Sequence, residues 1–264
     1  MTAYALPAPR LVAADLLKLR KNRSLSVVTG VLTVGAVVLT IAIIELLHVA
    51  NPAKHGPAGG IANLGHVSSL IGLLGVAAAA IVGSRAGAGD KDAGVYRDLV
   101  VTGRSRTSLF LSRIPAGAAF LLPFVTAAYA LAAVSSVVLA GSSPMPDARL
   151  LVLTGLWTVA GVAFFYVLSV AVAALLGSRS YAIGVVLAFR LAVTPIVASI
   201  SALGIVRELM PGVALQTLAP AGLGGSARMG PPIAMSTGAI AVVLLAWVVV
   251  AIAAAGWRDV TRDA

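Results

Sequence analysis

Six long apolar runs are the feature of this 264-residue sequence that most restricts its fold. Hydrophobic residues make up 59% of the chain and charged residues only 11%, whereas soluble domains carry about 25% charge. The bilayer core offers no partner to backbone N–H and C=O groups, so a spanning run must be helical. The sequence therefore predicts an all-α, polytopic membrane protein with a single transmembrane domain over residues 1–264. The expected spans are Ser26–Leu47, Val67–Gly83, Leu109–Ala140, Leu150–Leu176, Tyr181–Gly204 and Ile233–Ala255.

The basic residues indicate how these spans are oriented. Fourteen of the nineteen Lys and Arg residues lie in the N-terminal segment, between residues 85 and 113, at Arg179 or in the C-terminal tail. Because cytoplasmic loops carry an excess of Lys and Arg, both termini are expected in the cytoplasm. The net charge of +10 is therefore concentrated in alternate loops. A nucleic-acid partner is not expected, because it would require the basic residues to gather on one soluble face.

Catalytic and metal-binding constellations are missing from the sequence. There is no cysteine, and His48, His55 and His66 all lie in or beside the first outer loop. An intramembrane serine hydrolase would need a histidine deep in a span, and these histidine spacings are poor for a metal site. No Gly-rich phosphate loop with a following Lys-Ser/Thr is present. We therefore expect no enzyme, no metal site and no cofactor in this chain.

Residues 10–25 predict a helix that lies in the membrane interface before the first span. On a helical projection Asp15 and Lys18 share one face, and Leu16 and Leu19 share another. A basic amphipathic segment of this kind is typical of interfacial helices. The alternative is a charged flank that only fixes the orientation of the first span.

The cytoplasmic segment 85–107 is longer than a plain connection requires. Asp90 and Asp92 are placed to cap a short helix that begins near Ala93, and Gly103 is placed to end it. Held off the membrane, such a helix is suited to docking another protein. The alternative is an ordinary solvated loop.

The outer segment 205–232 contains an apolar stretch that is too short to cross the bilayer. Pro211–Ala219 would measure about 13 Å as a helix. It can enter the membrane and return only if protein or water covers its backbone. We therefore expect a re-entrant outer hairpin between the fifth and sixth spans.

Arg190 lies near the middle of the fifth apolar run, where a lone charge costs about 3 kcal/mol. One interpretation places it on a translocation path, where it faces a partner copy or Glu45. The other is structural: the side chain snorkels, or it bonds backbone carbonyls at a kink near Pro195. In the third span, Pro115 and Pro123 predict a kink, a tilt or an extension beyond the bilayer.

Together these features resemble the permease subunits of type 2 ABC exporters. In that family an acid, Gly-Thr, a helical turn and a Gly/Pro-x-Ser-Arg element lead into the third span. The corresponding residues are Asp92, Gly94-Val95, Tyr96–Val101 and Gly103-Arg104-Ser105-Arg106, followed by Leu109–Arg113. The sequence departs from the family pattern at Val95, where Thr is usual, and at Ser112-Arg113, where Gly-Lys is often found.

The resemblance implies a mechanism and a set of partners. Two copies of a separate cytoplasmic ATPase subunit would bind ATP and Mg, and a second copy of the chain or a homologous permease would complete the path in the lipid bilayer. An outer gate would include Met210, Pro211, Leu215 and Leu218, and close helix packing would use Gly72, Gly75, Gly184 and Ala188. ATPase coupling would fall to Asp92, Gly94, Tyr96, Arg97, Asp98, Leu99, Gly103, Arg104, Ser105 and Arg106.

The same resemblance implies export of an amphipathic or hydrophobic substrate, such as a drug, an antibiotic or a lipid-like metabolite, across a bacterial cell membrane. Two other classes remain open. A secondary transporter or channel would need an ion site or an inverted repeat, and neither is evident. A membrane assembly protein without catalytic function is the second.

Overall fold

The computed structural model describes residues 9–101, 103, 105–223 and 233–261, and this part of the chain folds entirely into helices and connecting turns. Within it, six helices are long and apolar enough to cross a membrane, which confirms the predicted all-α membrane fold. They extend over Arg23–Ala50, Gly60–Asp92, Arg106–Val138, Ala148–Leu176, Arg179–Ser199 and Thr237–Asp259.

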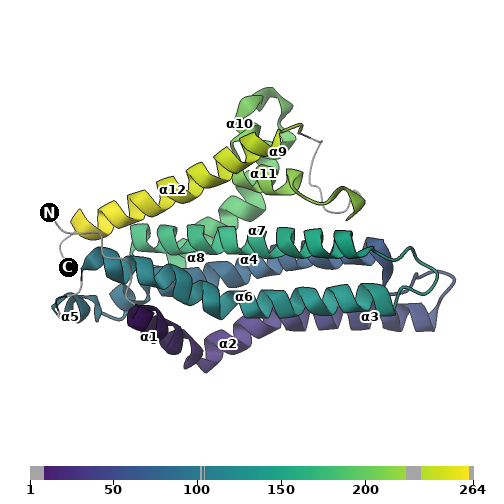
Figure 1. The fold of residues 1–264 in the computed structure, drawn as a ribbon, viewed down its shortest axis with the longest axis horizontal. Helices are drawn as coiled ribbons and strands as arrows, with labels where there is room; N and C mark the ends of the chain where they lie inside the picture. Colours follow the sequence, from purple (N-terminus) through teal and green to yellow (C-terminus); the bar gives the residue numbers. More distant parts are fainter. Residues whose placement is uncertain (1–8, 102, 104, 224–232, 262–264) are drawn as a thin grey trace.

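Figure 1 labels the helices in chain order, and within the described residues the first and fifth spans are each divided by a short π-helical turn. The elements are α1 (Pro9–Arg20), α2 (Arg23–Gly30), η1 (Val31–Gly35), α3 (Ala36–Ala50), α4 (Gly60–Asp92), α5 (Tyr96–Val101), α6 (Arg106–Val138), α7 (Ala148–Leu176), α8 (Arg179–Ala188), η2 (Phe189–Val193), α9 (Thr194–Ser199), η3 (Ser201–Leu203), α10 (Ile205–Glu208), α11 (Pro211–Thr217), η4 (Ala221–Leu223) and α12 (Thr237–Thr261).

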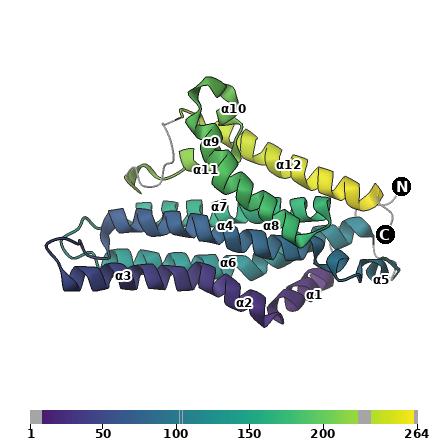
Figure 2. The same cartoon turned by 180° about the vertical axis from the view of Figure 1, so that it is seen from behind.

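The helices α4 and α7 run in the same direction and form the buried centre of the bundle (Figure 1). Most residues in their apolar stretches are buried, whereas only 17% of the corresponding stretches in the first and last spans are buried. Figures 1 and 2 show α1–α3 on one side of this centre and α9–α12 on the other. The exposed apolar faces of the outer helices are those expected to meet lipid or another protein chain.

Two glycines on α4 allow α7 to approach closely. A Cβ atom built on Gly83 would lie 2.6 Å from the Ser169 Cβ, and one built on Gly87 would lie 2.4 Å from the Val170 carbonyl oxygen. The four-residue spacing places both glycines on the same face of the helix. Van der Waals packing at small residues is a main source of helix association in lipid.

Only one of the predicted packing residues has this role. A Cβ on Gly75 would lie 3.0 Å from Val162, but Gly72 and Gly184 face open space, and Ala188 is exposed. Gly and Ala are frequent throughout the bundle, so the sequence alone did not identify the positions that face α7.

The segment expected to be a loop from Arg85 onward is instead the last part of α4. The 33-residue helix is about 50 Å long, which exceeds a hydrocarbon core of about 30 Å, so its final turns extend beyond the apolar region. Asp90 and Asp92 therefore lie in the last turn of α4 and do not cap α5. Gly94 (φ +70°) and Gly103 (φ +81°) permit the turns that bracket α5.

Other span boundaries also differ from the prediction, and the second span already begins at Gly60 rather than Val67. The third span continues as one helix through both internal prolines, from Arg106 to Val138. The fifth ends at Ser199 rather than Gly204, because the next residue is extended and a 3₁₀ turn follows. The sixth begins at Thr237 rather than Ile233.

The helix ends define two ends of the molecule. In both views α1, α5 and the end of α12 lie together, opposite the loops that join α3 to α4 and α6 to α7. We call the first the basic end, because it carries Lys18, Lys91, Arg106, Arg113 and Arg179.

Gly87→Ala is expected to destabilise the bundle by about 1–3 kcal/mol, because the added methyl group meets backbone that cannot rotate away. Thermal unfolding in detergent measures the change. The matched control is Gly184→Ala, which adds a methyl group in open space and should leave stability equal or slightly higher. Equal melting temperatures for the two variants would contradict the close α4–α7 packing.

The distribution of basic residues predicts that the basic end faces the cytoplasm. Single cysteines at Thr261 and Gly56, which are exposed at opposite ends, test this in intact cells with an impermeant thiol reagent. The account predicts labelling of the Gly56→Cys protein only, with Thr261→Cys becoming reactive after permeabilisation. The reverse pattern would invert the topology.

Candidate functional site

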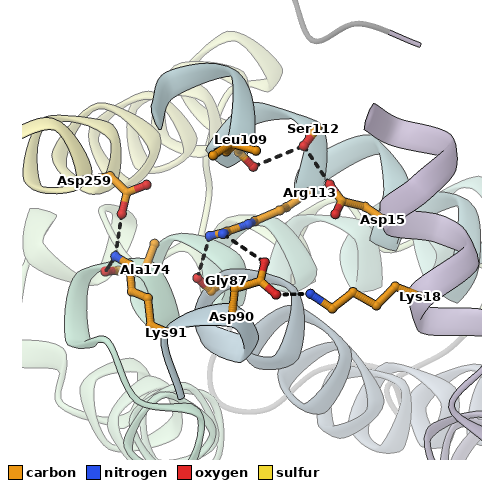
Figure 3. A network of polar contacts seen from close by, with 10 residues as sticks. All are labelled: Asp15, Lys18, Gly87, Asp90, Lys91, Leu109, Ser112, Arg113, Ala174 and Asp259. Atoms are coloured by element: carbon orange, nitrogen blue, oxygen red, sulfur yellow. Dashed lines mark hydrogen bonds and ion pairs between the residues drawn. The ribbon is translucent and has the colours of Figure 1, made fainter. Parts of the chain in front are cut away.

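Asp90 is the centre of a buried ionic network at the basic end (Figure 3). Its Oδ2 atom accepts a hydrogen bond of 3.2 Å from Nη2 of Arg113, and its Oδ1 atom contacts the Lys18 ammonium. Arg113 is 3% exposed and also donates from Nη1 to the Gly87 carbonyl oxygen at 3.0 Å. One carboxylate thus joins α1, α4 and α6.

The position of Asp90 explains why it needs two cations. The C-terminal end of a helix carries partial negative charge, so an acid in the last turn is unfavourable there. Burial adds a desolvation cost, which only a close and well-bonded counter-charge can offset. Arg113 supplies the buried partner, while Lys18 approaches from a helix whose charged group is still partly exposed.

Helix α1 is fastened to the bundle by polar and apolar contacts. The Ser112 hydroxyl donates to Oδ2 of Asp15 at 2.7 Å (Figure 3). Leu19 is buried, and Leu16 packs against the main core. The four residues singled out on this helix therefore all contact the bundle, which its sequence pattern alone did not show. Its position in the membrane interface remains a prediction.

Two further acids at helix ends are paired across the basic end. Asp259, near the end of α12, contacts the Lys91 ammonium and accepts at its backbone oxygen from Arg106 at 3.4 Å. Asp92 accepts from the backbone N–H of Arg179 at 3.2 Å and from its Nε at 2.6 Å. The negative charge of Asp92 is also stabilised by the partial positive charge at the N-terminus of α8. The basic end is therefore connected to both α8 and α12.

Helix α5 lies at the extreme of the basic end, away from the bundle (Figures 1 and 2). Asp98 is exposed, Val95 is 41% exposed and Val101 is 79% exposed. Of the predicted coupling residues, Arg104 and the side chains of Tyr96 and Arg97 lie outside the described part of the chain.

The remaining coupling residues have defined positions. Ser105 caps α6 by accepting from the Ser108 N–H at 3.2 Å, and Leu99 is half-buried within α5. Gly94 and Gly103 form the flanking turns. The structure brings Asp92 and Arg106 together with other helices.

Arg190 lines a cavity of about 300 Å³ between α4, α7, η2 and α11. Its guanidinium carbon lies 5.8 Å from the centroid of the Phe165 ring. In the described part of the chain, no carboxylate lies within 4 Å of it and no hydrogen bond to a backbone carbonyl is formed. The Glu45 carboxylate instead accepts from the Ala58 N–H at 3.2 Å, so the predicted pairing of Arg190 with Glu45 is wrong.

Pro195 accounts for the local backbone at Arg190. Proline lacks an N–H, so a carbonyl of the preceding turn loses its α-helical partner, and the proline ring crowds that turn. The backbone before Pro195 leaves α-helical geometry, whereas α6 stays α-helical at Pro115 and Pro123. The chain adopts a π-helical turn over Phe189–Val193, and the Thr194 N–H and hydroxyl both bond the Phe189 carbonyl. Such turns are frequent at functional sites. The backbone is therefore irregular just before Pro195, and Arg190, which lies in this turn, lines the cavity.

The other wall of the cavity comes from α11, whose backbone is covered by protein. Trp157 donates from Nε1 to the Leu215 carbonyl at 2.7 Å, and Trp247 donates to that of Leu209 at 2.8 Å. A Cβ on Gly212 would lie 2.4 Å from Thr194, so α11 starts directly against the end of the π-helical turn.

The predicted gate residues are not equivalent. Pro211 and Leu215 are buried, Met210 is half-buried, and Leu218 is 39% exposed. Protein cover over the backbone of α11 is what a re-entrant segment requires. The hairpin and the gate remain predictions, and residues 224–232 of the outer segment lie outside the described residues.

Sequence reasoning missed most of the ionic network. Asp90 was interpreted as a helix cap, whereas Ser112, Arg113, Lys91 and Asp259 were given no role. A signal was present, because Arg113 lies within a long apolar run just as Arg190 does. A charge in such a position needs a partner, and the nearest acids along the chain are Asp98, Asp92 and Asp90.

Asp90→Asn is expected to destabilise the protein by about 3–5 kcal/mol, because it removes the carboxylate that the buried Arg113 guanidinium contacts. The melting temperature in detergent measures this, with Asp98→Asn on the exposed helix α5 as the control that should change nothing. If both variants melt at the parental temperature, Asp90 does not hold the basic end together.

The comparisons with known proteins agree with this architecture. A comparison with curated proteins finds no match to this sequence. The family model described as "ABC-2 family transporter protein" matches residues 11–195, which is more than half of the chain and includes α1, α5 and Arg190. Together with six candidate spans, this match shows a multi-pass membrane permease family. The chain belongs to the ABC-2 family of transporter proteins.

Proposed function

We propose that this chain is the permease subunit of an ATP-driven exporter and that a separate cytoplasmic ATPase docks on its basic end. The observation that carries the proposal is α5, a short helix at the extreme of that end with an apolar residue, Val101, left 79% exposed. Exposed apolar side chains beyond the length of the spans gain from being covered by a protein partner.

The surroundings of α5 fit the transmission of force from such a partner. The turn at Gly94 connects α5 directly to the end of α4, and the cap at Ser105 connects it to α6. Those two helices are joined by the Asp90–Arg113 pair. A rigid displacement of α5 would therefore move α4 and α6 together, because separating their ends would leave buried charges unpaired.

A second permease copy would meet this chain along its exposed apolar side chains. Val38, Leu39 and Leu46 on α3 and Val242, Leu245 and Val249 on α12 are among the exposed apolar residues of the outer helices. These faces suit lipid as well as a partner, so pairing with a second copy or a homologous permease rests on the family.

The secondary-transporter alternative has less support. Within the described residues, the acidic side chains in the membrane spans lie near the ends of those spans, and no group of three or more potential metal ligands gathers. Ion-coupled carriers place their coupling-ion sites near the bilayer midplane. Export as the direction, and an amphipathic cargo, are part of the proposal and come from the family together with the apolar bundle.

The docking surface is tested with Val101→Glu, which adds a charge to an exposed position that contributes little to folding. Co-expressed with the Walker-motif ATPase subunit that the proposal requires, the variant should retain less than about a tenth of the parental ATPase after affinity purification. The matched control is Met145→Glu, which is 62% exposed at the opposite end and should bind normally.

Two outcomes would contradict the docking assignment. One is a Val101→Glu protein that recovers the full amount of ATPase and supports ATP-dependent transport. The other is an equal loss in the Met145→Glu control, because it would show that added charge disturbs the whole protein rather than a surface at α5.

A further inference from the structure

The cavity beside Arg190 combines apolar walls with a single positive charge. Leu73, Val76, Val162 and Phe165 contribute apolar surface, and Arg190 enters from η2. Gly72 faces the space and leaves it open, since no atom lies within 4 Å of the Cβ it lacks. At about 300 Å³ the cavity is at the lower end of the range typical of small-molecule sites.

In the described part of the chain, the N–H groups of the Arg190 guanidinium donate no hydrogen bond and form no ion pair. It lies about 17 Å along the helix from Arg179, near the middle of the bilayer. The Arg190 guanidinium lies 5.8 Å from the centroid of the Phe165 ring. A cation–π contact of that length offsets only part of the free energy that burying the Arg190 charge costs. An anionic group in the cavity would compensate the remainder.

Two buried hydroxyl groups line the same cavity and lack partners. Ser68 is 0% exposed and Thr158 is 3% exposed, and neither hydroxyl forms a hydrogen bond. Hydroxyl groups in helices usually bond a carbonyl in the preceding turn, as Ser69 does with Gly65 at 2.9 Å. A buried hydroxyl without a partner is costly, which points to a bound group that accepts from it.

We propose that this cavity binds the head group of an anionic amphipathic molecule, a carboxylate or phosphate monoanion. Arg190 forms the ion pair, Ser68 and Thr158 donate to the remaining oxygens, and the apolar body of the molecule lies along Val76 and Phe165. Gln216 and Leu215 of α11 close the outer side. That the bound molecule is the transported substrate rests on the proposed function. Binding in the cavity does not, because it requires no ATPase.

Binding is measured on the full chain in phosphatidylcholine nanodiscs, using Trp157 in the cavity wall as the reporter. Dibromostearate is added, and its methyl ester serves as the uncharged probe. A Trp157→Phe protein records quenching at the other tryptophans, so the difference isolates the cavity. We expect saturable quenching by the acid and little by the ester.

The variants separate charge from shape. Arg190→Gln should weaken dibromostearate binding by about tenfold or more, and Arg190→Lys should weaken it less, because it keeps the charge. The matched control Arg149→Gln removes an exposed cation of α7 outside the cavity and should bind normally. Gly72→Leu extends a side chain into the cavity from a position where a Cβ meets no atom within 4 Å, and it should abolish binding at unchanged thermal stability.

A second arm identifies the source of the anion. In nanodiscs without added fatty acid, quenching by brominated phosphatidylglycerol but not by brominated phosphatidylcholine assigns the site to a lipid head group. Quenching by dibromostearate alone assigns it to a free amphiphile. Either result supports an anion site.

Equal quenching by acid and ester, or unchanged affinity in both Arg190→Gln and Gly72→Leu, would overturn the inference. Its failure is distinguishable from failure of the proposed function, because the measurement contains no ATPase. A chain that binds the acid but recruits no ATPase keeps the site and loses the exporter assignment.

Discussion

The buried contact between Asp90 and Arg113 is the interaction on which the basic end of the molecule depends. An acid at the negative end of α4 and a guanidinium inside an apolar helix are each unfavourable alone, and each is the other's compensation. Lys18 connects α1 to this pair. The next two residues after Asp90 make further contacts: Lys91 contacts Asp259 of α12, and Asp92 contacts Arg179 of α8. A single helix end thereby fixes the positions of four other helices around the chain segment that carries α5.

The same geometry connects the basic end to the cavity by short physical steps. Asp92 bonds the first residue of α8, and ten residues later that helix enters the π-helical turn that carries Arg190. The turn ends at Thr194, against which Gly212 places the start of α11. A displacement at α5 thus has a continuous rigid path, through packed elements, to both walls of the cavity. Coupling along this path is a physical expectation that mutation of its members would measure.

Much of the architecture was predictable because the bilayer leaves few alternatives to a helix of sufficient length. The six spans, the separate α1 and the short α5 bracketed by glycines followed from hydropathy and turn chemistry. The predictions that failed depended on which face of a helix meets which neighbour. Hydropathy gives no direction to Gly72 or Gly184, and it did not show that α4 continues to Asp92. Pairing Arg190 with Glu45 failed for the same reason, since both lie in spans but Glu45 bonds the loop after α3. The role of Arg113 was within reach, because a charge in an apolar run requires a partner.

The central claim is that this chain moves its substrate only with energy from a separate ATPase. The most direct measurement is transport of an anionic amphiphile by proteoliposomes that contain the chain with or without the ATPase, with no ion gradient present. The account predicts transport that requires both subunits and hydrolysable ATP, and none with the chain alone. Transport by the chain alone, driven by a proton or sodium gradient and indifferent to ATP, would contradict it and favour a secondary transporter.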